Sequence, residues 1–240
     1  MMRPADLPDI RPLPLFRAMS EPHFRALMNH AHAQVFPAGL DLLQQGDPAD
    51  FLHVLVEGRV ELFATRGGRQ TTMAIVEPVA SFIIAACITD EPYLMSARTV
   101  ARSRIVLVPA QELKAVFRQD AAFAVSVIDE LAGSYRSMVR HAKSLKLRNS
   151  RERVAACLLQ LSRQQGDRQG FLLPLEKRRI ASWLGMTPEN LSRALKSLEP
   201  DGVKIDGRRV IITDPGRLGA LVGGDRLLDD PCGAWSPPAT

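Results

Sequence analysis

The sequence predicts an α+β fold, in which an antiparallel β-roll is followed by a long helix and a helical domain with a β-hairpin. Short apolar runs separated by turn residues fill residues 35–108, a pattern typical of antiparallel barrels and jelly rolls. Apolar residues then recur at spacings of four and three over residues 124–145, which indicates a helix. Two short helical patterns and an Asp-Gly turn follow within residues 176–213, and Asp-Gly between alternating apolar residues is a strong hairpin signal.

The N-terminal part is expected to begin with a short helical segment within residues 10–32, where apolar side chains recur at approximately helical spacing. Glycine and proline turns then divide the chain into expected strands. Pro109 opens the next helical pattern, and a long helix is expected from past Asp120 to about Leu147. The runs expected to form strands include FLHVLV, VELFA, TTMAIV, SFIIAAC and RIVLV.

An apolar seam runs along this long helix. Because its residues follow a heptad spacing, this seam is narrower than the apolar face of a helix that packs on the core of its own domain. The spacing therefore favours a parallel homodimer formed through the helix, with packing inside the chain as the alternative. The seam consists of Ala124, Ile128, Leu131, Tyr135, Met138, Ala142 and Leu145.

Positive charge is concentrated in one part of the 240-residue chain. Residues 1–132 carry a net charge of −3, residues 133–199 carry +9, and residues 200–240 carry −1. Such a distribution is expected of an element that binds a polyanion on an otherwise neutral body. A nucleic acid is therefore the expected partner, with a solvated helical face as the alternative for any single charge.

Several classes of protein are excluded by composition. The N-terminus lacks the apolar run of a secretory signal, and VASFIIAACI is about half the length that a membrane span needs. We therefore expect a cytoplasmic protein with no membrane partner. The three cysteines form no CxxC pair, which argues against an iron–sulfur cluster, zinc or redox chemistry.

The segment KRRIASWLGMTPENLSRALK has the spacing of a helix–turn–helix. Gly185 is placed to end the first helix in a left-handed conformation, Thr187 can cap the second, and Pro188 fits its first turn. The second helix of such a motif lies in the major groove of DNA, with its N-terminal residues against the bases.

Polar residues occupy the face of this second helix that should meet DNA. Glu189 can accept a hydrogen bond from cytosine N4, Arg193 can grip guanine O6 and N7, and Ser192 can do either. Further residues are expected to position the protein or contact phosphates, which adds affinity without sequence information. They are Thr187, Pro188, Asn190, Lys177, Arg178, Arg179 and Lys196, with Lys143, Lys146, Arg148 and Arg151 near the end of the long helix.

The order of β-roll, long helix and winged helix resembles the Crp/Fnr family of bacterial transcription regulators over residues 12–218. GDPADFLHVLVEGRVELF resembles the family's barrel-strand motif, and RERVAACLLQL resembles the helix that opens its DNA-binding domain. The E-x-x-S-R pattern of Glu189, Ser192 and Arg193 is similar to the Fnr-type reading helix, which implies TTGAT-like half-sites in an inverted repeat. Many relatives have a basic residue where this chain has Pro188, so the base preferred at the outer position of each half-site is left open.

The resemblance implies a homodimer that binds DNA and RNA polymerase and responds to a small effector. It implies three segments. Residues 1–120 form a sensor domain like cyclic-nucleotide-binding domains, and residues 121–148 form the dimerisation helix and hinge. Residues 149–220 form a winged helix–turn–helix. Beyond the resemblance, the composition of residues 221–240 predicts a disordered tail.

The expected sensor differs from that of the cyclic-nucleotide branch. Where that branch has a Gly-Glu pair for the ribose and an Arg-Ser pair for the phosphate, this chain has Ile84-Ala85 and Met95-Ser96. Without the glutamate and the arginine, cyclic AMP should bind poorly. The expected effector pocket, apolar apart from a histidine and a serine, consists of His53, Ile83, Ile84, Met95 and Ser96.

Such a pocket suits an apolar effector or a haem, with His53 either an axial ligand or an ordinary core residue. Three alternatives remain: a signal-independent regulator with a vestigial pocket, a cyclic-nucleotide-responsive regulator, and an interaction module that does not read DNA. His30 and His32 suggest a jelly-roll metalloenzyme as a function of another class, but no glutamate or third histidine follows at suitable spacing. We therefore expect no enzymatic activity and no metal site.

Overall fold

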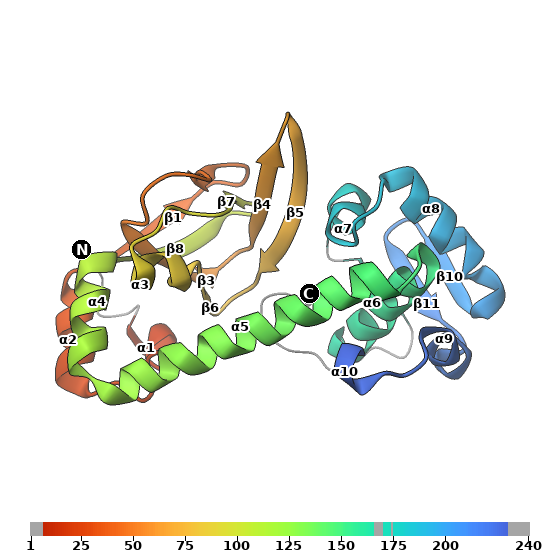
Figure 1. The fold of residues 1–240 in the computed structure, drawn as a ribbon. Helices are drawn as coiled ribbons and strands as arrows, with labels where there is room; N and C mark the ends of the chain where they lie inside the picture. The colour runs from red at the N-terminus through yellow and green to blue at the C-terminus, as the bar shows by residue number, and fades with distance from the viewer. Residues whose placement is uncertain (1–6, 166–169, 174, 230–240) are drawn as a thin grey trace. The chain divides into compact units, whose positions relative to one another are not determined.

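The computed structural model describes residues 7–165, 170–173 and 175–229. The chain folds into two compact units, Met1–Tyr135 and Arg136–Thr240 (Figure 1). Helix α5 (Ala121–Leu147) contributes to both, because the division falls inside it. Within the described residues, no helix combines the length and hydropathy needed to cross a bilayer.

The first unit is built on two four-stranded antiparallel sheets, which confirms the predicted β-roll. Their strand orders are β1-β8-β3-β6 and β2-β7-β4-β5. The core takes side chains from both sheets, such as Leu52 on β3 and Leu62 on β4. The strands are β1 (His32–Phe36), β2 (Asp41–Leu43), β3 (Phe51–Glu57), β4 (Val60–Arg66), β5 (Arg69–Val76), β6 (Ala80–Phe82), β7 (Ser96–Thr99) and β8 (Ser103–Pro109).

The hairpin between β4 and β5 shows how local sequence sets the register. Arg66 pairs with Arg69 across a two-residue turn, in which Gly67 and Gly68 have φ values of +57° and +73°. A type I′ turn needs positive φ at both central residues. Only glycine adopts such angles at little cost.

The first unit differs from the sequence prediction in two segments. The expected helical segment is shorter, because only α1 (Leu7–Ile10) and α2 (Glu21–Asn29) are helical and turns join them. The run SFIIAAC is not one strand, because Ile83 has a φ of +62° and Ile84–Thr89 forms helix α3. A short buried apolar run fits a strand or a helix equally well by periodicity. The prediction of a strand there is therefore wrong beyond Phe82.

Asp120 fixes the junction between α4 (Ala110–Gln119) and α5. Its carboxylate accepts from the backbone N–H groups of Phe123 and Ser20, at 3.0 and 2.9 Å, and lies 2.9 Å from His23 Nδ1. Burial alone would raise the pKa of Asp120, but these hydrogen bonds outweigh it and hold the pKa well below its ordinary value. The ionised form therefore stabilises the folded chain.

We expect Asp120→Asn to lower the free energy of unfolding at pH 7 by about 1–2 kcal/mol. The folded-state pKa is depressed, so the contribution is complete above the unfolded value of about 3.9 and is lost as pH falls through the folded value. Urea unfolding between pH 7 and pH 3 should therefore show a weaker pH dependence in the variant. Asp129→Asn, at an exposed position of the same helix, is the control; an equal effect there would contradict the assignment.

The described residues of the second unit form the C-terminal half of α5, five further α-helices, a 3₁₀ helix (Glu199–Asp201) and a small antiparallel sheet of order β10-β11-β9. Helix α6 packs against α8 and α9. The helices are α6 (Ser150–Gln165), α7 (Lys177–Trp183), α8 (Pro188–Ser197), α9 (Pro215–Val222) and α10 (Arg226–Asp229), and the strands are β9 (Phe171–Leu172), β10 (Val203–Asp206) and β11 (Arg209–Ile212).

The predicted disordered tail is wrong for residues 221–229. Helix α9 ends at Val222, and α10 is held to the rest of the unit by an ion pair of 2.7 Å between Asp229 and Arg148. Residues 230–240 lie outside the described residues. The hairpin predicted around Asp206-Gly207 is present as β10 and β11, with Asp206 opposite Arg209.

Candidate nucleic-acid interface

Helices α7 and α8 form the predicted helix–turn–helix, and the turn follows from local sequence. Gly185 has a φ of +64°. Its N–H donates to Ser182 O at 3.0 Å, and the N–H of Met186 donates to Ala181 O at 2.9 Å, the two bonds of a Schellman motif. A Cβ at position 185 would lie 2.8 Å from Leu145 Cδ2. Glycine is therefore favoured by the backbone angle, and a side chain at this position would also displace the end of Leu145.

The start of α8 is fixed by the two residues predicted for that role. Thr187 Oγ1 accepts from the N–H of Asn190 at 3.2 Å, and Pro188 occupies the first turn. A side-chain cap of this kind contributes about 1 kcal/mol. The orientation of α8 at its N-terminal end is therefore set by the chain itself.

The two sides of α8 differ sharply in character. Leu191, Ala194 and Leu195 are buried against the unit, whereas the predicted base-reading residues are all exposed. The structure thus brings Glu189, Ser192 and Arg193 together on one solvent-facing surface. Lys196 is exposed one turn further along the helix, and Asn190 is half-buried between the two sides.

The exposed side chains are already organised. Ser192 Oγ donates to Pro188 O at 3.0 Å, and the Arg193 guanidinium donates to Asn190 Oδ1. Hydrogen bonds from its own backbone amide and from the Thr187 side chain lower the pKa of Glu189, with the Arg193 charge adding to the effect. Glu189 is therefore an anionic acceptor, and Arg193 is a cation held near the N-terminal end of α8.

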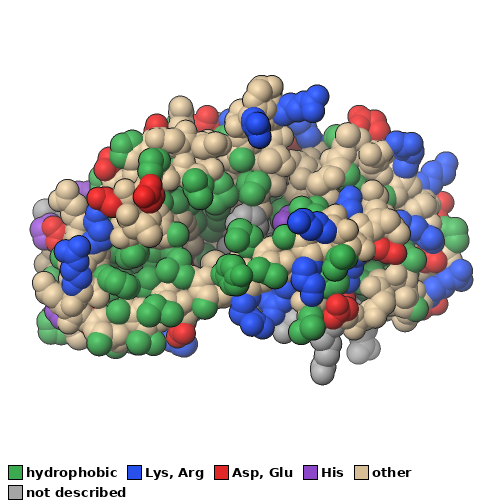
Figure 2. Space-filling model, viewed as in Figure 1, with side chains coloured by type: hydrophobic (Ala, Val, Ile, Leu, Met, Phe, Trp, Pro, Cys, Tyr) green, Lys and Arg blue, Asp and Glu red, His purple; other side chains and the backbone are tan. Residues whose placement is uncertain are grey.

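The basic residues near α7 divide into exposed and paired groups. Lys177 and Arg178 are exposed at the start of α7, whereas Arg179 lies 3.3 Å from Glu176 in an ion pair. Lys146 is exposed near the end of α5, and Lys143 is half-buried. In the view of Figure 2, Lys and Arg side chains are more numerous over the second unit than over the first.

One predicted phosphate contact is contradicted by the structure. Arg148 is only 8% exposed and its guanidinium is 2.7 Å from Asp229 Oδ1, so it holds the second unit together instead of facing an external polyanion. Arg151 forms an ion pair with Asp201, but its side chain is 41% exposed. Its contact with phosphate therefore stays a prediction.

Sequence reasoning missed Arg153, which joins the helix–turn–helix to the α5–α6 junction. Its Nε donates to Leu184 O at 3.0 Å, and its Nη1 donates to Arg148 O at 2.6 Å. Burial lowers its pKa. The sequence RNSRER (148–153) shows positive charge but does not reveal the partners of Arg153. Both acceptors are backbone carbonyls, which a sequence does not distinguish.

Most of the predicted seam on α5 is exposed to solvent. The exposed fractions are 58% for Ile128, 64% for Tyr135, 46% for Met138 and 38% for Leu145. Ala142 is also exposed, and Ala124 and Leu131 are half-buried. Hydrophobic side chains gather along α5 in the view of Figure 2. Packing inside the chain thus leaves most of this apolar surface uncovered.

The residues predicted to line the effector pocket do not all lie together. His53 is 5% exposed, and its ring lies 5.2 Å from the ring of Phe82 and 6.4 Å from that of Tyr93. Ser96 is on β7 in the other sheet, where its Oγ accepts from Gln45 N at 3.0 Å. Ile84 is buried in α3, and Ile83 and Met95 are half-buried.

These residues do not fit a haem or a metal well. Burial lowers the pKa of His53 to about 4, against a hydrogen bond to the Phe51 backbone, so the ring is neutral at pH 7. Its Nδ1 has no partner, but the rings of Phe82 and Tyr93 pack against the imidazole. Among the described residues, no group of three or more His, Cys, Asp or Glu side chains could hold a metal ion.

Comparison with known proteins gives two family matches. A model described as the Crp-like helix-turn-helix domain matches residues 152–221. A model described as the cyclic nucleotide-binding domain matches residues 33–120. Together these matches include the helix–turn–helix and most strands of the roll.

Two curated relatives match most of this chain. The CRP-like cAMP-activated global transcriptional regulator of Mycobacterium tuberculosis is 25% identical over 210 residues, which cover 85% of this chain and 94% of the relative. The nitrogen fixation regulation protein FixK of Azorhizobium caulinodans is 28% identical over 195 residues, 78% and 77% of the two chains. The structure of FixK2 from Bradyrhizobium japonicum has a TM-score of 0.70 at 25% identity and covers 80% of this chain and 96% of FixK2.

Proposed function

The chain belongs to the Crp/Fnr family of DNA-binding transcription regulators, and we propose that it acts as a homodimer on an inverted repeat with TTGAT-like half-sites. The relatives named above are regulators by name, and DNA binding is the activity proposed for this chain. RNA polymerase is the proposed protein partner of the DNA-bound dimer.

The exposed polar surface at the start of α8 carries this proposal. Glu189 presents an anionic acceptor that matches cytosine N4, and Arg193 presents a guanidinium that matches guanine O6 and N7. Ser192 presents a hydroxyl that can donate to or accept from a base edge. The capped, proline-started helix holds them at its N-terminal end, the part that recognition helices place against bases. Lys177, Arg178 and Lys196 are proposed to contact phosphates.

The seam on α5 supports the homodimer. An apolar strip on a helix of 27 residues, with a heptad spacing, fits a second copy of the same helix in a parallel pair. In such a pair the two α8 helices would read half-sites about 34 Å apart, one turn of DNA. The inverted repeat follows from the two-fold symmetry.

We propose that the effector is not cyclic AMP. Position 84 holds a buried isoleucine and position 85 an alanine, where a ribose would need a carboxylate, and position 95 holds Met instead of a phosphate-binding arginine. The close packing around His53 favours an apolar effector or a signal-independent regulator over a haem protein. Ser81 on β6 donates to Glu130 on α5, so the region next to α3 has a direct contact with the proposed dimerisation helix.

Fluorescence anisotropy tests the proposed DNA binding. At about 150 mM salt, purified protein should bind a TTGAT-N4-ATCAA duplex about a thousand-fold or more tightly than a scrambled duplex, the usual margin of specific binding. Adding cyclic AMP should change neither affinity. Specific binding that appears only with cyclic AMP would contradict the assignment of the effector. Salt-sensitive binding that is equal on both duplexes would favour a module that does not read sequence.

A further inference from the structure

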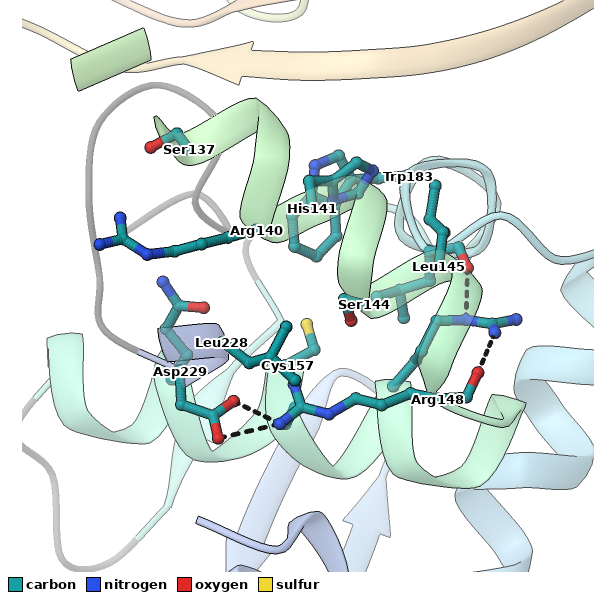
Figure 3. Close-up of a pocket in the computed structure, with 14 residues that line it drawn as sticks. Ser137, Arg140, His141, Ser144, Leu145, Arg148, Cys157, Trp183, Leu228 and Asp229 are labelled. Carbon is teal, nitrogen blue, oxygen red and sulfur yellow. Dashed lines mark hydrogen bonds and ion pairs between the residues drawn. The ribbon is translucent and has the colours of Figure 1, made fainter. Parts of the chain in front are cut away.

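Helix α10 lies beyond the part of the chain that the Crp-like helix-turn-helix model matches. The match ends at residue 221, and α10 follows at Arg226–Asp229. Asp225 starts this helix, because its carboxylate accepts from the N–H of Leu227 at 2.9 Å. Leu228 and Asp229 line a small cavity together with residues of α5, α6 and the end of α7 (Figure 3). Helix α10 is therefore in place to contact the junction between α5 and α6.

The contact with this junction is a buried ion pair. In Figure 3 the Arg148 side chain extends from the α5–α6 junction to Asp229 of α10. The Nη2 atom of Arg148 lies 2.7 Å from Asp229 Oδ1 and 2.9 Å from Oδ2. The two side chains are only 6% and 21% exposed. Because a buried guanidinium has lost its hydration, removing Asp229 would leave it without the charge that compensates this loss.

The same junction is linked to the helix–turn–helix. Asn149 and Glu152 start α6 with two reciprocal bonds of 2.9 and 3.0 Å between backbone N–H groups and side-chain oxygens, a capping arrangement. The carbonyl of Arg148 accepts from Arg153, which also donates to Leu184 O at the end of α7. A continuous series of contacts therefore runs from α10 through the α5–α6 junction to α7.

We propose that Asp229 is a positioning residue for DNA binding, which holds Arg148 and thereby fixes the angle between the C-terminal half of α5 and α6. The proposal rests on the homodimer and the inverted repeat proposed above. On that repeat, two α8 helices must reach half-sites one turn of DNA apart. A rigid junction makes the second half-site contact effectively intramolecular, and a loose junction lowers its effective concentration. Contact of one α8 with one half-site does not depend on this angle.

Two duplexes separate positioning from a purely structural role. One contains TTGAT-N4-ATCAA, and the other contains a single TTGAT half-site and is too short for the second subunit to reach. Asp229→Asn should weaken binding to the repeat about tenfold and binding to the half-site by less than about twofold. Partial unfolding of the second unit would instead weaken both alike. Fluorescence anisotropy measures the two affinities, and circular dichroism checks that the variant is folded.

Matched variants test whether the ion pair is the cause. Asp229→Glu keeps the carboxylate and should restore most of the affinity for the repeat. Glu199→Gln removes the same charge at an exposed position of the same unit, so it should leave the ratio of the two affinities unchanged. Arg148→Gln should resemble Asp229→Asn, and the double variant should lose no more than either single one. If Asp229→Asn does not fold, the double variant replaces it, because it leaves no buried charge unpaired.

Hydrogen exchange tests the proposal without DNA. The N–H of Arg148 donates to Ser144 O at 3.2 Å, and the N–H of Arg153 donates to Asn149 O at 3.0 Å. Both amides should exchange faster in Asp229→Asn than in the parent or in Glu199→Gln, because the junction opens more often.

Three results would overturn the proposal: an equal loss on both duplexes, no loss on the repeat, or unchanged exchange at the junction in Asp229→Asn. A parent protein that does not prefer the repeat over a scrambled duplex would contradict the proposed function instead. Hydrogen exchange would then still decide whether Asp229 fixes the junction.

Discussion

Replacing Arg193 with Ala should weaken binding to the TTGAT inverted repeat by about 10- to 100-fold for each half-site. The reason is the loss of a bidentate contact to guanine, which discriminates by about 1–3 kcal/mol. In the free protein the guanidinium donates to Asn190, so binding exchanges this bond for the base contact. Binding to a scrambled duplex should change much less, because no base contact is lost there.

Two further substitutions separate base reading from phosphate binding. Arg193→Lys keeps the charge but lacks the planar fork, so it should lose most of the specificity and little of the non-specific affinity. Lys177→Gln should weaken binding to both duplexes equally and reduce the slope of log affinity against log salt by about one. Fluorescence anisotropy over a series of salt concentrations measures both quantities. An equal loss on both duplexes for Arg193→Ala would instead make Arg193 a phosphate contact.

Ile128→Asp should convert the dimer to monomers. Ile128 is 58% exposed on the proposed seam, and burying an isoleucine contributes about 1.5–3 kcal/mol. The pair loses this contribution twice and gains two facing carboxylates. We therefore expect the dimer dissociation constant to rise by a factor of about 10² to 10⁴. Sedimentation velocity measures the change, and affinity for the full inverted repeat should fall with it.

Ala122→Asp is the matched control. Ala122 is exposed on the same helix but lies about 120° around its axis from Ile128. It should leave the proposed dimer intact. A parent protein that sediments as a monomer would contradict the homodimer, and a dimer that survives Ile128→Asp but not Ala122→Asp would place the interface on another surface.

Local sequence determined the helix–turn–helix and the reading surface. Gly185, Thr187 and Pro188 act on neighbours within four residues, through a left-handed cap, a side-chain cap and a fixed φ. The exposed face of α8 follows from helical periodicity alone, as does the apolar seam of α5. The order of strand runs and turns likewise predicted the β-roll. These features were predictable because their causes lie close together in the chain.

Tertiary structure decided which of the remaining polar residues are available. Arg148 was expected to contact phosphate, yet it pairs with Asp229, 81 residues away, and α10 is ordered through that contact. The run after Phe82 is a helix, although a short buried apolar run fits a strand equally well by periodicity. Periodicity shows which side of a helix is polar, but the partner of a charge depends on distances that only the folded chain sets.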